Sequence, residues 1–282
     1  MRALSRKLRR CAALTAIMLA LTAAPTVALA MVATPAHADS GISQRMGIDG
    51  CGLNTTARVT AFWTSTPYYN FGLYMGGAVA TCPTNSASFV SALLEQGWRL
   101  MPIWVGPQAP CSGFGTRMSS DTATAYQQGK TEAAAVYGRL MSLGINTQDT
   151  PVTYDLENYP TTNTACVNAV KSFMQGWVYQ LHLPPAQKAG VYGSTCASGL
   201  SALATFSPTV DFISGAAWNG DRNTANMPCI NSGYWVSNQR HKQYQGGHNE
   251  TWNGVTLSVD SDCSNGPVYP GPDNLSVGQG CV

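Results

Sequence analysis

The chain has 282 residues, with 16 Lys and Arg against 14 Asp and Glu and a formal net charge of +2. Five of the bases and none of the acids lie in residues 1–38, which leaves 11 bases against 14 acids, or a net charge of −3, in the rest. This balance argues against the basic surface that nucleic acids and anionic membranes require, so we expect no nucleic-acid partner.

The first 38 residues have the pattern of a secretory signal peptide. A basic start precedes the apolar run 12–30, and Ala36-His37-Ala38 is a small-residue cleavage site, with cleavage after Ala30 as the alternative. Threonines and a proline dilute the apolar run, so we expect no stable membrane insertion after signal cleavage. The pattern predicts a protein secreted to the extracellular space or cell envelope, with residues 39–282 as one domain and a monomer as its state.

Strands and helices alternate along this domain. Apolar runs bounded by Gly or Pro predict eight strands, and apolar residues at helical spacing predict helices over 86–96, 121–143, 164–181 and 199–205. The strands are expected at 45–50, 71–77, 98–106, 151–159, 188–194, 210–219, 241–245 and 255–260. This order predicts a TIM-type (β/α)8 barrel. Residues 220–238 are irregular, and 246–254 is too short for a helix, so closure around strands six to eight is expected to be irregular.

Cysteine usage fits an oxidising compartment. Cys11 lies in the leader, and the eight cysteines after residue 38 are enough for four disulfides stapling the loops, although eight cysteines allow 105 pairings. No C-x-x-C spacing suggests zinc, and the histidines lack ligand spacing. We therefore expect no metal and no cofactor.

Carboxylates recur on strands in a pattern that a buried sheet does not explain. In 151–159, Asp155 and Glu157 share a face opposite Val152 and Leu156, because strand side chains alternate. Asp49 ends the first strand, and Asp260, followed by Asp262, is expected at the end of the eighth. At a barrel mouth such acids would converge, as glycoside hydrolysis requires. The alternative is that they are solvated or paired with Arg and Lys.

The order of several short motifs resembles that of family 25 glycoside hydrolases, the Chalaropsis-type lysozymes. These motifs are Gly47-Ile-Asp49, Tyr154-Asp-Leu-Glu157, Val191-Tyr-Gly193, Trp218, Gln243-Tyr-Gln245 and Val259-Asp260. The closer resemblance is to a group of actinobacterial secreted glycoside-hydrolase-like proteins of unknown function. The resemblance implies that Glu157 is the general acid and that Asp155, Asp49 and Asp260 position water or the N-acetyl group of the substrate.

The chain also departs from the lysozymes. It has Ile48-Asp-Gly-Cys51 where they usually have Val-Asp-Val-Ser, and Val259-Asp-Ser-Asp262 where they tend to have Val-Asp-x-Asn. The disulfide-rich loops are unlike theirs as well. These differences leave room for another substrate preference, or for a cleft that binds without cutting.

Residues for substrate binding are expected beside the acids. We assign this role to Trp218, Tyr244, Tyr192 and Gln243, whose rings and amide suit a sugar, although buried aromatic residues are more often simple packing. The sequence thus predicts a glycoside hydrolase-like protein acting on polysaccharide, with β-1,4 bonds of peptidoglycan as the expected target. The alternatives are a non-catalytic glycan-binding or cell-envelope protein, and a structural protein whose acids are salt-bridged.

Overall fold

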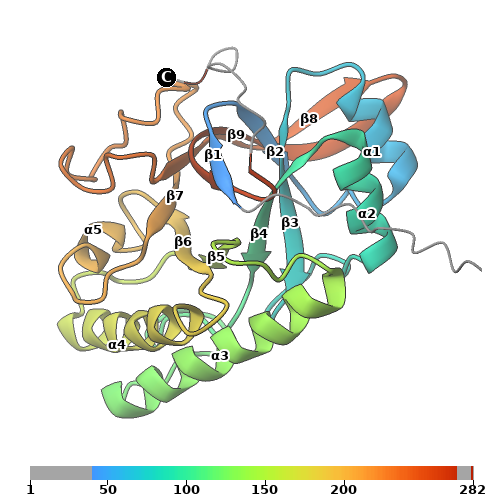
Figure 1. Cartoon of the computed structure of the whole chain (residues 1–282). Coiled ribbons are helices and arrows are strands. Elements are labelled where there is room, and N and C mark those ends of the chain that lie inside the picture. Colours follow the sequence, from blue (N-terminus) through green and yellow to red (C-terminus); the bar gives the residue numbers. More distant parts are fainter. Residues whose placement is uncertain (1–39, 272–280, 282) are drawn as a thin grey trace, which may run out of the picture. The chain divides into compact units, whose positions relative to one another are not determined.

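The computed structural model describes residues 40–271 and 281, and the expected signal peptide lies outside these residues. Eight strands form a closed barrel, and a short ninth strand, β1 (Gly41–Ser43), pairs with β9 at its edge (Figure 1). The barrel strands are β2 (Met46–Asp49), β3 (Asn70–Gly76), β4 (Arg99–Trp104), β5 (Pro151–Asp155), β6 (Lys188–Ser194), β7 (Phe212–Ala216), β8 (Arg240–Trp252) and β9 (Val255–Val268). The predicted barrel is confirmed.

The barrel closes through an antiparallel strand. Strands β2 to β8 are parallel neighbours in sequence order, whereas β9 runs antiparallel to both β8 and β2. The β8–β9 hairpin turns at Asn253 and Gly254, which both have positive φ, as the common two-residue hairpin turn requires. The expected irregular closure is thus a hairpin that extends beyond the barrel (Figure 1).

The direction of β9 corrects the position predicted for Asp260. The strand does not end there but continues to Val268, so the prediction that Asp260 lies at a strand's C-terminal end is wrong. Asp260 instead pairs with Asp49, the last residue of β2. Because β9 is antiparallel, an early part of this strand lies at the end of the barrel where β2 to β8 finish.

Five helices connect the parallel strands: α1 (Thr56–Trp63), α2 (Ala87–Gln96), α3 (Thr122–Leu143), α4 (Thr164–Leu181) and α5 (Leu200–Leu203). The side chains of Ser86, Asp121 and Asn163 cap the starts of α2, α3 and α4, while Gly97 and Gly144 end α2 and α3 in the left-handed conformation. The first helix is absent from the sequence prediction. Residues 217–239, between β7 and β8, contain no helix.

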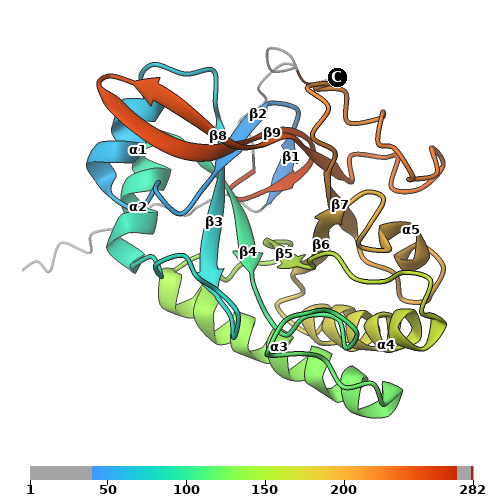
Figure 2. The same cartoon turned by 180° about the vertical axis from the view of Figure 1, so that it is seen from behind.

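Helices α3 and α4 lie side by side beneath the barrel in both views (Figures 1 and 2). Their close approach depends on two glycines. A Cβ at Gly129 would lie 2.0 Å from the Phe173 carbonyl oxygen, and one at Gly176 would lie 2.0 Å from that of Tyr126. The long helix is therefore held against its neighbour by backbone contact as well as by apolar side chains.

All eight cysteines after residue 38 form disulfides, as predicted: Cys51–Cys82, Cys111–Cys166, Cys196–Cys229 and Cys263–Cys281. Three of these bonds join segments that follow the ends of parallel strands, where the loops surround the barrel mouth. Within residues 40–271, no helix is long and apolar enough to span a membrane.

Candidate active site

A cavity of about 320 Å³ lies at the mouth of the barrel, and the four predicted catalytic acids line it together. Asp49 comes from β2, Asp155 and Glu157 from β5 and the residues just after it, and Asp260 from β9. Asp262, two residues further along β9, lines the same cavity. The pleat and the hairpin thus bring five carboxyl groups from three strands to one place.

Asp49 is buried and held by three neighbours. Its carboxyl group accepts hydrogen bonds from the Tyr74 hydroxyl (2.8 Å) and the Gln243 amide (3.1 Å), and it shares a third with Asp262. Burial and the nearby Asp260 raise the pKa of Asp49 to about 7, and the three hydrogen bonds offset part of that rise.

Asp262 is the fifth acid that lines the cavity, and the sequence prediction named it without assigning a role. It is buried, and burial together with the charges of Asp49 and Asp260 raises its pKa well above the ordinary value. Asp262 therefore carries the proton of the hydrogen bond that it shares with Asp49. Its other oxygen, Oδ2, is buried without a hydrogen-bond partner. Strand side chains alternate, so the pattern that directs Asp260 into the mouth directs Asp262 there too. This alternation is the sequence pattern from which a place for Asp262 at the site could be predicted.

Asp155 lies at the end of β5 and is only 8% exposed. Burial, followed by the charges of Glu157 and Asp49, raises the pKa of Asp155 to about 8. Its Oδ1 is buried and has no hydrogen-bond partner. A buried acid without a donor is costly to ionise, so Asp155 holds its proton at neutral pH.

Glu157 follows the end of β5 and is solvent-exposed, in contrast to Asp155. Partial burial of its carboxyl group raises the pKa, and the backbone N–H of Asn158 offsets part of this rise. Gln108 fixes the backbone here, because its amide donates to the Asp155 carbonyl (2.8 Å) and accepts from the Glu157 N–H (2.8 Å). No local sequence pattern predicts a role for this buried glutamine.

No lysine or arginine is among the described residues that line the cavity. The only basic side chain there is His241, which is buried and whose pKa burial lowers to about 4, so it is neutral at pH 7. The structural alternative, in which Arg or Lys neutralises the acids, therefore does not describe this mouth. The described residues also contain no cluster of three or more His, Cys, Asp or Glu suited to a metal ion.

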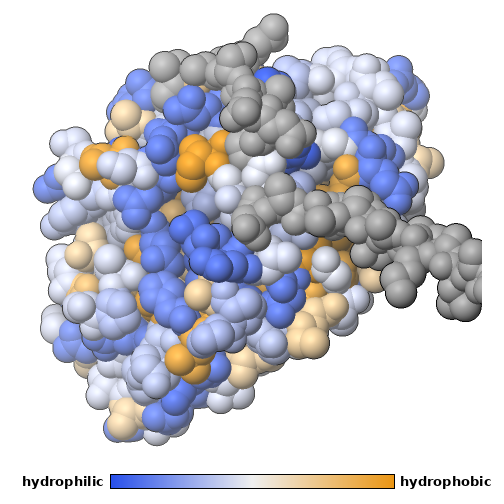
Figure 3. All heavy atoms as spheres, viewed as in Figure 1, coloured by the Kyte–Doolittle hydropathy of each residue, from blue (hydrophilic) through white to orange (hydrophobic). Residues whose placement is uncertain are grey.

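Gln243 joins the acids to two aromatic side chains. Its Oε1 accepts hydrogen bonds from the Tyr192 hydroxyl and the Trp218 indole N–H, both at 2.9 Å, which directs its amide nitrogen to Asp49. Trp218 is 67% exposed, the most of the exposed large apolar residues. The face of the molecule in Figure 3 mixes hydrophilic residues with small apolar groups. Gln243, Tyr192 and Trp218 all line the cavity.

Tyr244, the remaining predicted substrate-binding residue, does not lie with the others. It follows Gln243 on β8 and so points to the opposite face, it is 5% exposed, and it is not among the residues that line the cavity. The guanidinium of Arg222 lies 5.4 Å from its ring centre. Tyr74, which the sequence prediction omitted, takes a place beside Asp49 instead.

Comparisons with known proteins agree with this fold. A family model described as "Rv2525c-like, glycoside hydrolase-like domain" matches residues 61–264. An uncharacterized B. stearothermophilus protein of solved structure is 15% identical with a TM-score of 0.52, covering 78% of this chain and 95% of its own. No curated protein matches the chain.

Two further structures are similar at lower TM-scores. A family 25 glycosyl hydrolase from Bacillus anthracis is 13% identical (TM-score 0.47, covering 82% of this chain and 91% of its own). The bacterial lysozyme from Streptomyces coelicolor is also 13% identical (TM-score 0.48, covering 79% and 93%). At such identities structural likeness concerns the fold alone, whereas the family model spans most of the sequence. The chain belongs to the Rv2525c-like, glycoside hydrolase-like domain family.

Proposed function

We propose that this protein is a secreted glycoside hydrolase that cleaves β-1,4 bonds of cell-wall glycan, peptidoglycan in particular. The observation that carries the proposal is the set of five carboxyl groups in the cavity at the barrel mouth, where no lysine or arginine is found among the described lining residues. Salt bridges do not neutralise these acids, and several have raised pKa values. Such a set provides both a proton donor and groups able to stabilise positive charge on a sugar ring.

Glu157 is the best candidate for the proton donor. It is the most exposed of the acids at the mouth, and its pKa is raised, so a fraction of it stays protonated in mildly acidic solution. Gln108 holds its backbone in place through two hydrogen bonds across the end of β5. A donor must be both accessible to the glycosidic oxygen and firmly positioned, and Glu157 meets both requirements.

The aspartates take the supporting roles in this proposal. Asp155 lies deeper and stays protonated at neutral pH, so it can donate a hydrogen bond to the sugar or its N-acetyl group. Asp49, whose pKa burial raises to about 7, and Asp260 stabilise the positive charge of an oxocarbenium-like ring. Four disulfides and the expected signal peptide support secretion, because disulfides persist in oxidising compartments.

The second candidate is glycan binding without turnover, and the same pKa values favour it. Protonated Asp155 and Asp262 are hydrogen-bond donors in a cavity that also offers amide and aromatic groups. A cavity with donors of this kind can hold a sugar whether or not the bond is cut. Only a turnover measurement separates the two functions.

The test is release of reducing ends from purified peptidoglycan and from N-acetylglucosamine oligomers. The samples are the disulfide-bonded protein, Glu157→Gln, and Glu95→Gln, which makes the same change at an exposed position on α2. Hydrolysis requires that the parent and Glu95→Gln release reducing ends while a folded Glu157→Gln releases at least a hundredfold less. Binding of glycan by all three proteins without any release would instead establish the second candidate.

A further inference from the structure

A second cavity adjoins the first and is about 430 Å³ in volume. We call it the loop pocket, because residues from the segment 217–239 wall it together with the ends of β6 and β7. Glu157, Tyr192 and Trp218 line both cavities. The two cavities are therefore adjacent, and Glu157 lies at their boundary.

The lining of the loop pocket differs from that of the acid cavity. Its polar groups are the neutral side chains of Asn158, Ser194, Thr195 and Asn219, and within the described part of the chain Glu157 is the only charged residue that lines it. Its volume lies in the range of pockets that bind small molecules. Neutral hydroxyl and amide groups beside an aromatic ring suit a sugar that carries hydroxyls and an N-acetyl group, while Glu157 disfavours an anionic one.

The segment 217–239 is firmly fixed although it has no helix or strand. The guanidinium of Arg240 donates to four backbone carbonyls in it, those of Ala225, Asn231, Ser232 and Tyr234. The ammonium of Lys242, whose side chain is fully buried, donates to the carbonyls of Asn223 (3.2 Å) and Asn226 (2.7 Å).

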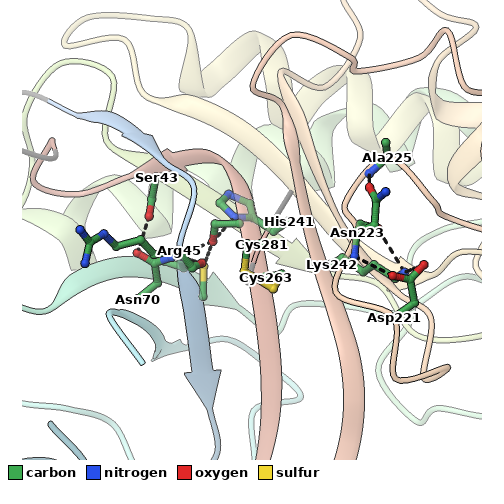
Figure 4. Close-up of a disulfide and its surroundings, with 12 residues drawn as sticks. Ser43, Arg45, Asn70, Asp221, Asn223, Ala225, His241, Lys242, Cys263 and Cys281 are labelled. Carbon is green, nitrogen blue, oxygen red and sulfur yellow. Dashed lines mark hydrogen bonds and ion pairs between the residues drawn. A yellow bond between two sulfur atoms is a disulfide. The ribbon is translucent and has the colours of Figure 1, made fainter. Parts of the chain in front are cut away.

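Asp221 completes this arrangement, with its carboxylate 3.6 Å from the Lys242 nitrogen (Figure 4). The Cys196–Cys229 disulfide ties the segment to the end of β6. The segment that walls the loop pocket is therefore held by the side chains of Arg240 and Lys242 and by one disulfide. A pocket shaped before its ligand arrives loses less entropy on binding.

Trp218 forms the partition between the two cavities. A Cβ at Gly246 would lie 2.2 Å from the indole, so the glycine leaves the space in which the ring packs. Its N–H is bound to Gln243, yet the side chain remains 67% exposed. An exposed ring held in one orientation at the junction is suited to stack on a sugar unit.

We infer that the loop pocket is the subsite for an uncharged, N-acetylated sugar unit on the leaving-group side of the cleaved bond. The inference rests on the proposed hydrolase function. The ring that gains positive charge belongs beside Asp49, Asp155 and Asp260 in the acid cavity. The sugar across the bond then lies on the other side of Glu157, in the loop pocket.

The chemistry balances with this placement. The bond between the anomeric carbon and the glycosidic oxygen breaks, and the oxygen takes the Glu157 proton and leaves with the sugar in the loop pocket. A water molecule supplies hydroxide to the anomeric carbon, and its remaining proton restores Glu157. No other reactant is required.

Two substrates test the subsite. The tetramer of N-acetylglucosamine has a sugar as its leaving group, whereas N,N′-diacetylchitobiosyl fluoride has a fluoride ion, which is too small to use the loop pocket. The measured quantity is the ratio of kcat/KM for the tetramer to kcat/KM for the fluoride. This ratio isolates the leaving-group side, because changes in the acid cavity affect both substrates.

The main variant is Ala216→Leu, which extends a side chain into the loop pocket, and Ser194→Ala is a milder change that removes one hydroxyl there. Ala134→Leu, at an exposed position on α3, is the matched control. We expect Ala216→Leu to lower the ratio at least tenfold, Ser194→Ala to lower it about three- to tenfold, as the loss of one hydrogen bond does, and Ala134→Leu to leave it unchanged.

The outcomes separate the two proposals. If the parent hydrolyses both compounds and neither pocket variant changes the ratio, the loop pocket is not the leaving-group subsite, while the hydrolase function stands. If the parent hydrolyses neither the tetramer nor the fluoride, nor peptidoglycan, the hydrolase function fails, and the leaving-group role fails with it.

Discussion

Replacing Asp155 with asparagine should stabilise the protein increasingly as the pH rises. The pKa of Asp155 is about 8 in the folded protein against 3.8 as a model value, mainly because the carboxyl group is buried. The folded protein therefore binds this proton more tightly than the unfolded chain does. The contribution of protonated Asp155 to the stability of the folded protein is complete below pH 3.8 and is lost as the pH rises through 8.

The size of this stability loss follows from the pH range between the two pKa values of Asp155, about 3.8 in the unfolded chain and about 8 in the folded protein. Each pH unit within it costs the folded state about 1.4 kcal/mol. Between pH 5 and pH 7 the parent should therefore lose about 3 kcal/mol of stability relative to Asp155→Asn. Asparagine has the same shape and carries no charge, so the variant should lack this contribution to the pH dependence.

Urea unfolding at half-unit steps from pH 5 to pH 8 measures the difference. The control is Asp121→Asn on the fully exposed cap of α3, where hydrogen bonds from Thr124 lower the pKa and asparagine can still cap the helix. The difference between this control and the parent should stay constant over the range. If the Asp155→Asn difference is also constant, Asp155 is already ionised at pH 5 and our description of the buried acids is incorrect.

Three further substitutions test how the site is positioned. Gly72→Ala should displace Asp49, because the new Cβ would lie 2.3 Å from that of the aspartate, and turnover should fall at least tenfold with a smaller loss of stability. Gly246→Ala should displace the Trp218 indole, which a shift in tryptophan fluorescence and a higher KM would report. Gln108→Leu should lower the free energy of unfolding by about 1 to 3 kcal/mol, because it leaves buried backbone groups unpaired, and should lower kcat more than it raises KM. An unchanged kcat in Gln108→Leu would contradict its role in placing Glu157.

Much of the barrel could be predicted because its signals are local. The helix over 164–181 and the strand over 188–194 have the predicted bounds, since apolar spacing and flanking turn residues define them. Alternation along 151–157 also identified Asp155 and Glu157 as a pair at the mouth. These features depend on neighbours within a few residues, which sequence alone contains.

Features that depend on distant contacts could not be predicted in this way. The antiparallel direction of β9 brings Asp262 beside Asp49, although more than two hundred residues separate them in the sequence. The two carboxyl groups then share a hydrogen bond, which no local pattern predicts. Gln108 and the loop carbonyls around Lys242 likewise depend on segments that come together only in the folded chain. An aromatic residue beside a predicted strand end suggests a sugar-stacking role for Tyr244, but strand alternation directs its side chain to the other face.

The most direct test of Glu157 as proton donor compares two leaving groups. Dinitrophenolate leaves a sugar without protonation, whereas the oxygen of a natural glycoside requires an acid. We expect Glu157→Gln to lose at least a hundredfold in kcat on an N-acetylglucosamine oligomer but less than tenfold on the 2,4-dinitrophenyl chitobioside. Equal losses on both substrates would contradict the assignment of Glu157, and no turnover of either of them, nor of peptidoglycan, by the parent would contradict the proposed hydrolase.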